Sequence, residues 1–318
     1  MRTFLFILLV VCTALPAHAQ EYPARPVHFV VPYTPGTGAD ILARLLGPKL
    51  GEKWNVAVVT ENKPGATGNI GTEYVAKAPP DGHTLLLVAT SFGTTPALRK
   101  SLPFDPLNDF APVSLIATSS LAVVINPKLP ARSLKEFIEL AKNQPGKMHY
   151  SSPGNGGPQH LAMELIKLET GIDIVHVPYK GAAGALADVV AGHVDAMISA
   201  TQTAYPHVQS GRLRALALMS PERSAAYPDV PTIREQGLRD LEVETWYGAF
   251  APAGTPAAVV SRINAELDVA LRDPQVRSVL EKQAMTPVGG APQRLGDLVK
   301  KELPRWKRVV GAAGIKAD

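Results

Sequence analysis

The amino-acid sequence predicts an α/β protein of two lobes, each with a mostly parallel sheet flanked by helices and joined to the other by a two-strand hinge. Strand-like and helical patterns alternate along the chain, an order that is typical of parallel sheets. One plan of strand, glycine loop and helix occurs twice, about 115 residues apart by the matching glycines. Two long apolar stretches, one between the repeats and one after them, predict the hinge.

The first 19 residues are typical of a cleavable export signal. Arg2 precedes an apolar run from Phe4 to Val11, and a small-x-small pattern ends at Ala19. This run is far shorter than the roughly 20 residues of a membrane-spanning helix, so we expect cleavage after Ala19. Cys12, the only cysteine, lies inside the signal, where the preceding Val11 disfavours lipid attachment. We therefore expect neither a disulfide nor a cysteine-bound metal in the mature chain.

The expected mature chain, 318 − 19 = 299 residues, is long enough for two domains of ordinary size, and 46% of the whole sequence is hydrophobic. The net charge is only +4, and basic residues are scattered apart from a few between 300 and 308. This distribution lacks the patch of clustered lysines and arginines that is typical of a nucleic-acid-binding protein.

The first repeat contains three expected strands. A β-rich run at 27–31 leads through 35–38 (PGTG) into a helix, and the apolar face of that helix carries Ile41, Leu42, Leu45, Leu46 and Leu50. A strand at 56–60 leads through 63–68 (KPGATG) into another helix. A third strand at 84–89 closes the unit.

The second repeat follows the same plan. A strand at 147–152 leads through 153–156 (PGNG) into a helix whose apolar stripe contains Leu161, Leu165 and Leu168. A strand at 172–177 leads through 180–184 (KGAAG) into a helix, and a strand at 194–199 closes the unit. Because parallel sheets bind ligands beyond the carboxyl ends of their strands, we expect all four glycine loops to face a cleft between the lobes.

We interpret 113–126 and 241–250 as the two crossings of the hinge. We accordingly expect lobe 1 to consist of 20–122 together with 248–318, and lobe 2 of 123–247. Trp246 and Tyr247 are expected to pack within the hinge.

The tail is expected to begin with a helix that packs back on the first lobe. Thr255 and Pro256 predict its cap and its first residue, and its apolar positions recur at helical spacing: Val259, Val260, Ile263, Leu267 and Leu271.

Glycine just before a helix has a chemical use of its own. The first N–H groups of a helix have no intrahelical partner, the helix end carries about half a positive charge, and glycine lets an anion approach the backbone closely. One helix end supplies up to about 2 kcal/mol, whereas micromolar affinity needs about 8 kcal/mol. We therefore expect serine and threonine hydroxyls, packing by Tyr33 and Tyr179, and closure of the lobes to supply the remainder.

Five segments in order resemble the Bug-type substrate receptors of tripartite tricarboxylate transporters. They are 33–40 (YTPGTGAD), 61–68 (ENKPGATG), 80–85 (PDGHTL), 150–156 (YSSPGNG) with His160 and Leu161, and 177–181 (VPYKG). Each motif is weak alone, but five in order behind an export signal are specific. The resemblance covers essentially the whole mature chain.

The resemblance implies a type II periplasmic-binding-protein-like fold and a monomer in the periplasm that carries a small carboxylate to membrane transporter subunits. It implies that the first loop and the loop at Ser151 hold one ligand carboxylate, partly through ordered waters. Members bind tricarboxylates, dicarboxylates, acidic amino acids or aromatic acids. The family usually has two adjacent glycines after the first-loop proline, whereas Thr37 separates Gly36 from Gly38 here, so loop shape and ligand size can differ.

The residues that we expect to bind the ligand come from the glycine loops, from the strand ends and from the helices that follow them. They are Tyr33, Pro35, Gly36, Thr37, Gly38, Asp40, Ala66, Thr67, Ser91, Thr94, Ser151, Ser152, Gly154, Gly156, His160, Tyr179 and Asp195.

Three of these residues also have a purely structural interpretation. Asp40, in a first helical turn, complements the helix dipole and can accept hydrogen bonds from loop amides, which we favour over ligand contact. His160 fits a packed or capping histidine as well as a ligand group. Asp195 is expected to tether a loop, with contact to an amino or hydroxyl group of the ligand as the alternative.

A hydrolase is the alternative from another functional class. Residues 89–93 (ATSFG) follow a strand and imitate a nucleophile elbow with Ser91 as the nucleophile, and histidines follow downstream. No acidic residue stands out to orient a histidine, and the repeated loops stay unexplained, so we expect no catalysis. A ligand sensor for a membrane signalling protein is a second alternative.

No cofactor and no metal are expected. The sequence contains neither a phosphate-binding loop with its lysine nor a full dinucleotide glycine set. Its histidines and carboxylates do not cluster at metal-ligand spacing.

Overall fold

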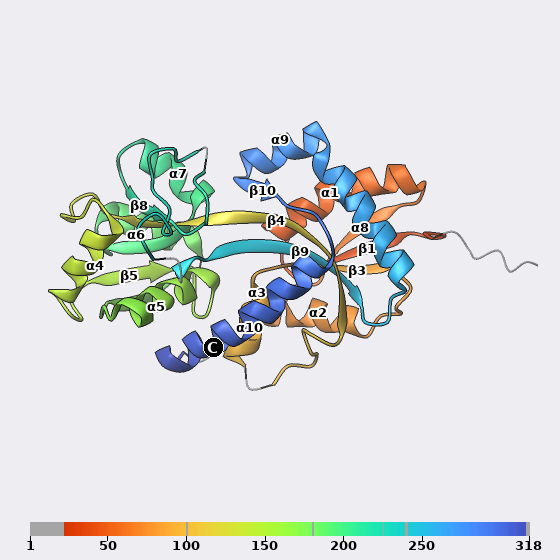
Figure 1. Ribbon diagram of the computed structural model, residues 1–318, viewed down its shortest axis with the longest axis horizontal. Coiled ribbons are helices and arrows are strands. Elements are labelled where there is room, and N and C mark those ends of the chain that lie inside the picture. The colour runs from red at the N-terminus through yellow and green to blue at the C-terminus, as the bar shows by residue number, and fades with distance from the viewer. Residues whose placement is uncertain (1–21, 100, 180, 225, 239–240, 316–318) are drawn as a thin grey trace, which may run out of the picture.

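The computed structural model shows two lobes side by side, connected by the long strands β4 and β9 (Figure 1). It describes residues 22–99, 101–179, 181–224, 226–238 and 241–315, and the expected export signal lies outside these ranges. Within them the strands are β1 (Val27–Val31), β2 (Val58–Asn62), β3 (Thr84–Ala89), β4 (Phe110–Ile125), β5 (His149–Ser152), β6 (Val175–Pro178), β7 (Ala196–Ala200), β8 (Arg214–Leu218), β9 (Glu244–Pro252) and β10 (Met285–Pro287).

Helices alternate with these strands through most of the described chain. They are α1 (Gly38–Trp54), α2 (Asn69–Ala76), α3 (Ser91–Leu98), α4 (Leu134–Lys142), α5 (Pro158–Thr170), α6 (Ala182–Ala191), α7 (Thr201–Gln209), α8 (Ala257–Arg272), α9 (Pro274–Lys282) and α10 (Gln293–Ala313), with a short 3-10 turn, η1 (Ala66–Gly68).

The two lobes contain parallel sheets with the same arrangement of strands. In the first lobe β1 pairs in parallel with β2 and β3, and in the second lobe β5 pairs in parallel with β6 and β7. The strand orders β2-β1-β3 and β6-β5-β7 are the duplicated plan that the sequence predicted. The expected fold class, two lobes with mostly parallel sheets flanked by helices, is therefore confirmed.

Strand β4 belongs to both lobes. Its first part pairs antiparallel with β9, and its last residues, 121–125, pair antiparallel with β7 and β8. Ile116 lies in the core of the first lobe and Leu121 in the core of the second, so the chain crosses between these two positions. Strand β9 lies between β3 and β4, and β10 adds a further antiparallel pairing to β4.

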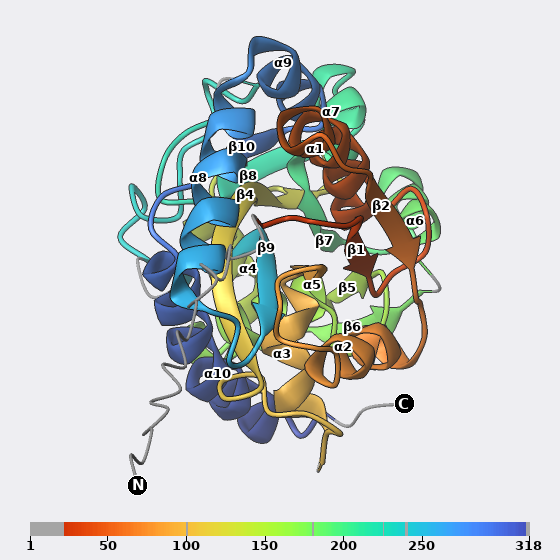
Figure 2. The same ribbon diagram turned by 90° about the vertical axis from the view of Figure 1, so that its right-hand side faces the viewer.

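The sheet of the first lobe is covered on both faces, which explains why its strands are nearly continuous apolar runs. Phe29 of β1 packs with Leu42 of α1 and Ile263 of α8 on one face. Val30 packs with Phe92 of α3 and Leu295 of α10 on the other. Figure 2 shows these two layers, with α1 and α8 on one side of the strands and α2, α3 and α10 on the opposite side.

Helix α10 packs on both lobes, whereas the tail was expected to pack on the first alone. Leu295 and Val299 belong to a core of the first lobe, but Trp306 and Val309 belong to the core of the second. A 21-residue helix is about 30 Å long, so its apolar face extends past one lobe and along the next.

Two local expectations differ from the structure. Helix α8 begins at Ala257 because Pro256 has an extended ψ of 135°, and the Thr255 hydroxyl donates to the Pro252 carbonyl instead of capping the helix. Leu168 of α5 is 41% exposed, while Leu165 is buried, because the second-lobe core covers only the earlier turns of that face.

Candidate functional site

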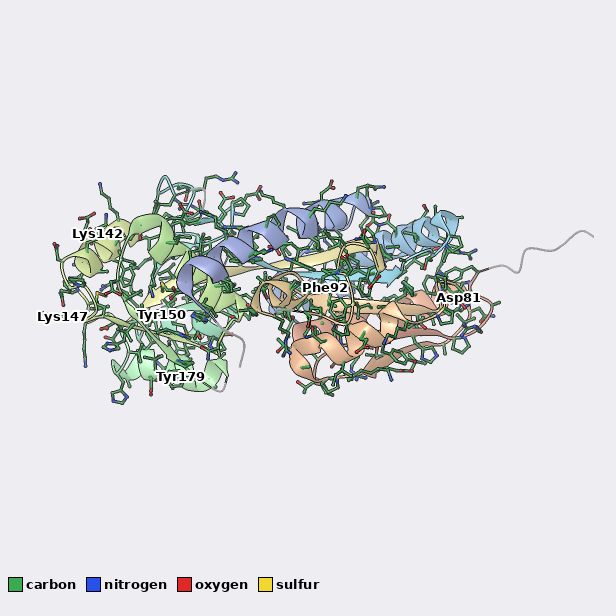
Figure 3. All side chains as sticks on the ribbon, turned by 90° about the horizontal axis from the view of Figure 1, so that it is seen from below. Asp81, Phe92, Lys142, Lys147, Tyr150 and Tyr179 are labelled. Carbon is green, nitrogen blue, oxygen red and sulfur yellow. The ribbon has the colours of Figure 1, made fainter. Side chains whose placement is uncertain are left out.

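A cavity of about 450 Å³ lies between the two lobes at the carboxyl ends of the parallel strands. Its wall is formed by the first-lobe loops after β1 and β2, by helix α3, and by the second-lobe loop after β5. Figure 3 places Phe92 of α3 near the middle of the molecule, and Tyr150 and Tyr179 within the second lobe. Three of the four glycine loops that we expected at one cleft line this cavity, whereas no described residue of the loop after β6 does.

The loop after β1 is held in shape by Asp40. Its carboxylate accepts hydrogen bonds from the Gly36 N–H at 2.9 Å, from Arg44 Nε at 3.0 Å and from Asn62 Nδ2 at 2.9 Å. Burial by itself raises the pKa of Asp40, but these hydrogen bonds outweigh it and leave the pKa below its ordinary value. Asp40 does not line the cavity, so these contacts support the structural interpretation of this residue.

Thr37, the departure from the usual glycine pair, lines the cavity without distorting its loop. Its hydroxyl donates to the Thr34 carbonyl at 3.0 Å, and its backbone is extended. Gly38 next to it is required for packing rather than for ligand approach, because a Cβ there would lie 2.6 Å from Cζ of Tyr247 in β9. Tyr247 thus fixes the start of α1 against the hinge.

Tyr33 connects the first loop to the start of α3. Its hydroxyl accepts a hydrogen bond from the Ala89 N–H at 3.1 Å and shares another with Ser91 Oγ at 2.6 Å. Burial raises the pKa of the Tyr33 phenol, so it stays protonated near neutral pH. The ring also packs against the Gly68 backbone in the loop after β2, where Thr67 adopts a positive φ of 59°.

One face of α3 forms a wall of the cavity. Positions i, i+3, i+4 and i+7 of this face line it, together with the residue that follows the helix: Ser91, Thr94, Thr95 and Leu98, and then Arg99. The last three were absent from the predicted site, although the helical spacing of Thr95 and Leu98 from Ser91 and Thr94 is a sequence signal that could have revealed those two. Thr95 is buried, and its hydroxyl has no hydrogen-bond partner among the described residues.

The second-lobe loop reaches across to this wall. Gly156 has a positive φ of 69°, and a Cβ there would lie 2.5 Å from Cδ1 of Leu98 in the first lobe. Its N–H donates to Nδ1 of His160 at 2.9 Å. Burial, with a smaller effect of Lys167, lowers the pKa of His160 to about 4, so the imidazole is neutral and able to accept this bond.

The serines at the end of β5 are bound within their own lobe and do not line the cavity. Ser151 Oγ donates to the Ala185 carbonyl at 3.0 Å. Ser152 Oγ donates to the Gly154 carbonyl at 2.9 Å and lies 2.6 Å from Nε2 of His176. Their contacts shape the loop that carries Gly156.

Of the predicted ligand-binding residues, six line the cavity: Tyr33, Thr37, Thr67, Ser91, Thr94 and Gly156. The structure places the others around it or away from it: Pro35, Gly36, Gly38, Asp40, Ala66, Ser151, Ser152, Gly154, His160, Tyr179 and Asp195. Tyr179 donates a hydrogen bond to the Asp188 carboxylate, and Asp195 accepts one from the His149 N–H at 2.7 Å. Asp195 therefore ties β7 to the amino end of β5, at the opposite end of this strand from the cavity.

The neighbours of Ser91 do not form a hydrolytic triad. Its hydroxyl pairs with the phenol of Tyr33, while the buried His160 and the part-buried His176 bond to Gly156 and Ser152. Among the described residues, no three histidine, cysteine or acidic side chains gather as metal ligands. The described helices also include none with the length and apolarity needed to cross a bilayer.

Residues 42–315 match the family described as tripartite tricarboxylate transporter family receptor. The chain belongs to this family. Protein BugT of Bordetella pertussis is 37% identical to it over 305 residues, covering 95% of this chain and 94% of BugT. The Bug-type resemblance is therefore confirmed, and a receptor of this family is a solute-binding protein.

Solved structures similar to this receptor chain share its fold over nearly their whole length. One described as a periplasmic transporter is 40% identical with a TM-score of 0.77, covering 93% of this chain and 100% of that one. A Rhodopseudomonas palustris protein solved with adipate is 34% identical, with a TM-score of 0.77 and coverages of 93% and 99%. MatC of the same species, solved with bound malate, is 32% identical, with a TM-score of 0.74 and coverages of 91% and 100%.

Proposed function

We propose that this receptor captures a small carboxylate in the cavity between its lobes, in the periplasm, and delivers it to the membrane subunits of a tripartite transporter. The observation that carries the proposal is the composition of the cavity wall. Hydroxyls, backbone amides and one arginine line it, and none of the described lining residues is acidic. Such a wall favours an anion, and the adipate- and malate-bound relatives support a carboxylate.

Two helix amino termini add to this preference. Helix α1 begins beside Thr37 and helix α5 begins beside Gly157, both of which line the cavity, and neither helix has a side-chain cap. Their first N–H groups are therefore available to an anion held between the lobes. Because one helix end supplies at most about 2 kcal/mol, the hydroxyls of Tyr33, Ser91 and Thr94 are needed as well.

Binding is proposed to bring the first lobe, built on β1–β3, against the second lobe, built on β5–β7, by a motion about β4 and β9. The contact between Gly156 and Leu98 would form part of the closed interface. This closure would present one shape to the transporter when the ligand is bound and another when it is absent.

A thermal-shift panel of monocarboxylates, dicarboxylates, tricarboxylates, aromatic acids and acidic amino acids tests the proposal. A ligand at 100 times its Kd stabilises the folded state by about 2.7 kcal/mol, which corresponds to a melting shift of roughly 5–10 °C in a chain of this size. Stabilisation by sugars or amines, with no effect of any carboxylate, would overturn the proposal.

A variant pair locates the binding. Thr94→Val removes a cavity hydroxyl with little change in volume and is expected to weaken the best carboxylate several-fold. Thr286→Val, at an exposed position in β10, is the matched control and should leave the affinity unchanged. Equal effects of both variants would place the ligand elsewhere.

A further inference from the structure

The cavity wall contains one arginine, Arg99, whose guanidinium has no role in the proposal so far. Arg99 is the only residue with a formal charge among the described residues that line the cavity. No described carboxylate forms an ion pair or a hydrogen bond with its guanidinium. An arginine that lines an otherwise uncharged cavity, with no acidic partner among the described residues, is suited to an anionic group of the ligand.

Arg99 directly follows the carboxyl end of α3, which separates it from the first-lobe loops at the other end of the helix. Ser91, at the amino end of this helix, is fixed by Tyr33 from the loop after β1. Leu98, the last residue of α3, lies about 10 Å along the helix axis from Ser91, and Arg99 follows it with an extended backbone, so the guanidinium starts well away from Ser91. The arginine is therefore available to a second group of the same ligand.

The wall between these ends changes from polar to apolar. Along the lining face of α3 the order is Ser91, Thr94, Thr95 and Leu98, and Arg99 follows the helix. Hydroxyls thus lie towards the first-lobe loops, and an apolar side chain precedes the cation. A ligand that matches this order has a carboxylate at each end and methylenes between them.

We propose that Arg99 binds the second carboxylate of the ligand, so that this receptor selects straight-chain dicarboxylates over monocarboxylates of equal length. The inference rests on the proposed function, because it assigns the first carboxylate to the same cavity. The planar guanidinium can hold a carboxylate through two parallel hydrogen bonds, which a hydroxyl or a single amide cannot do.

Matched ligand pairs test the inference by isothermal titration calorimetry at constant salt. The pairs are succinate with butyrate, glutarate with pentanoate, and adipate with hexanoate, and each pair differs only in the second carboxylate. We expect the wild-type protein to bind at least one dicarboxylate about 10- to 100-fold more tightly than its monocarboxylate. Arg99→Gln should abolish this ratio while changing the monocarboxylate affinity no more than about threefold.

Two further variants separate ligand binding from a structural role. Arg99→Lys keeps the charge without the planar fork and should retain part of the ratio. Arg272→Gln, at an exposed position in α8, should retain all of it. Melting of the ligand-free variants shows whether each is folded, and the ratio between paired ligands does not depend on the fraction of folded protein.

The outcomes distinguish this inference from the proposed function. If the wild-type protein binds carboxylates but Arg99→Gln leaves the dicarboxylate preference intact, the inference is wrong and the proposed function stands. If the wild-type protein prefers monocarboxylates, the inference is also wrong. If no carboxylate binds, both the inference and the proposed function fail.

Discussion

Replacing Glu302 with glutamine is expected to change how the stability of this receptor depends on pH. Glu302 lies in α10, is 6% exposed and accepts a 2.8 Å hydrogen bond from Nε1 of Trp246 in β9. A Cβ on Gly93 of α3 would lie 2.9 Å from its Oε2, so there is no room for water on that side. Burial raises the pKa of this carboxyl from 4.5 to about 7, although the Trp246 hydrogen bond and basic residues of α10 lower it in part.

The sign and size of the effect follow from this pKa. A carboxyl whose pKa is higher in the folded state than in the unfolded state stabilises the fold below the unfolded pKa, and this stability is lost as pH rises through the folded pKa. The rise from 4.5 to about 7 corresponds to roughly 3 kcal/mol at most. Glutamine carries no charge, so Glu302→Gln should be within about 1 kcal/mol of the wild type at pH 5 and exceed its stability by up to about 3 kcal/mol at pH 8.

Urea unfolding followed by tryptophan fluorescence, at several values between pH 5 and pH 8, measures this difference. The comparison is made at each pH because other groups titrate in both proteins: His160 and His176 have pKa values lowered to about 4 by burial, so they stabilise the fold increasingly as pH rises towards 6.5. Glu139→Gln, at a side chain that is 60% exposed, is the control and should show no such trend. A stability difference for Glu302→Gln that stays constant from pH 5 to pH 8 would refute the reasoning.

Two other substitutions test how the cavity is held in shape. Asp40→Asn should lower the free energy of unfolding by about 1–3 kcal/mol at pH 7 and weaken carboxylate binding, because the Gly36 N–H and Arg44 lose their shared anion; unchanged melting and affinity would contradict this. Gly156→Ala should weaken binding at least tenfold, because a left-handed conformation costs about 1–2 kcal/mol in a residue with a Cβ and because the methyl group meets Leu98. Adding Leu98→Ala should recover the steric part, and no recovery would argue against this interlobe contact.

Much of the architecture could be predicted from local sequence patterns. The apolar run of β1, the loop glycines and the periodic leucines of α1 occur together, and the same order reappears at β5 and α5. Strand pairing in the two lobes is identical because each repeat encodes the same unit. The glycine loops could be placed at one cleft because consecutive parallel strands bring their carboxyl ends to one edge of a sheet.

The cavity wall was harder to predict. Helix α3 contains Pro96 and only one glycine. In the sequence this segment resembles a nucleophile elbow, and nothing in it indicates a helix that lines a binding site. Arg99 has no signature of its own, since an arginine after a short helix is usually solvated. Its relation to the cavity depends on how α3 packs against the second-lobe loop near Gly156, a contact between residues distant in the sequence.

Local interactions alone determined the strands, most helices and the glycine loops of this protein, because these depend on residues within a few turns of one another. Only the tertiary structure decided which contacts require glycine at those positions. Gly38 leaves room for Tyr247, more than 200 residues away, and Gly156 leaves room for Leu98 across the cleft. It also decided that α10 packs on both lobes and that Arg99 lies in the cavity wall, since burial and charge pairing depend on which surfaces meet after folding.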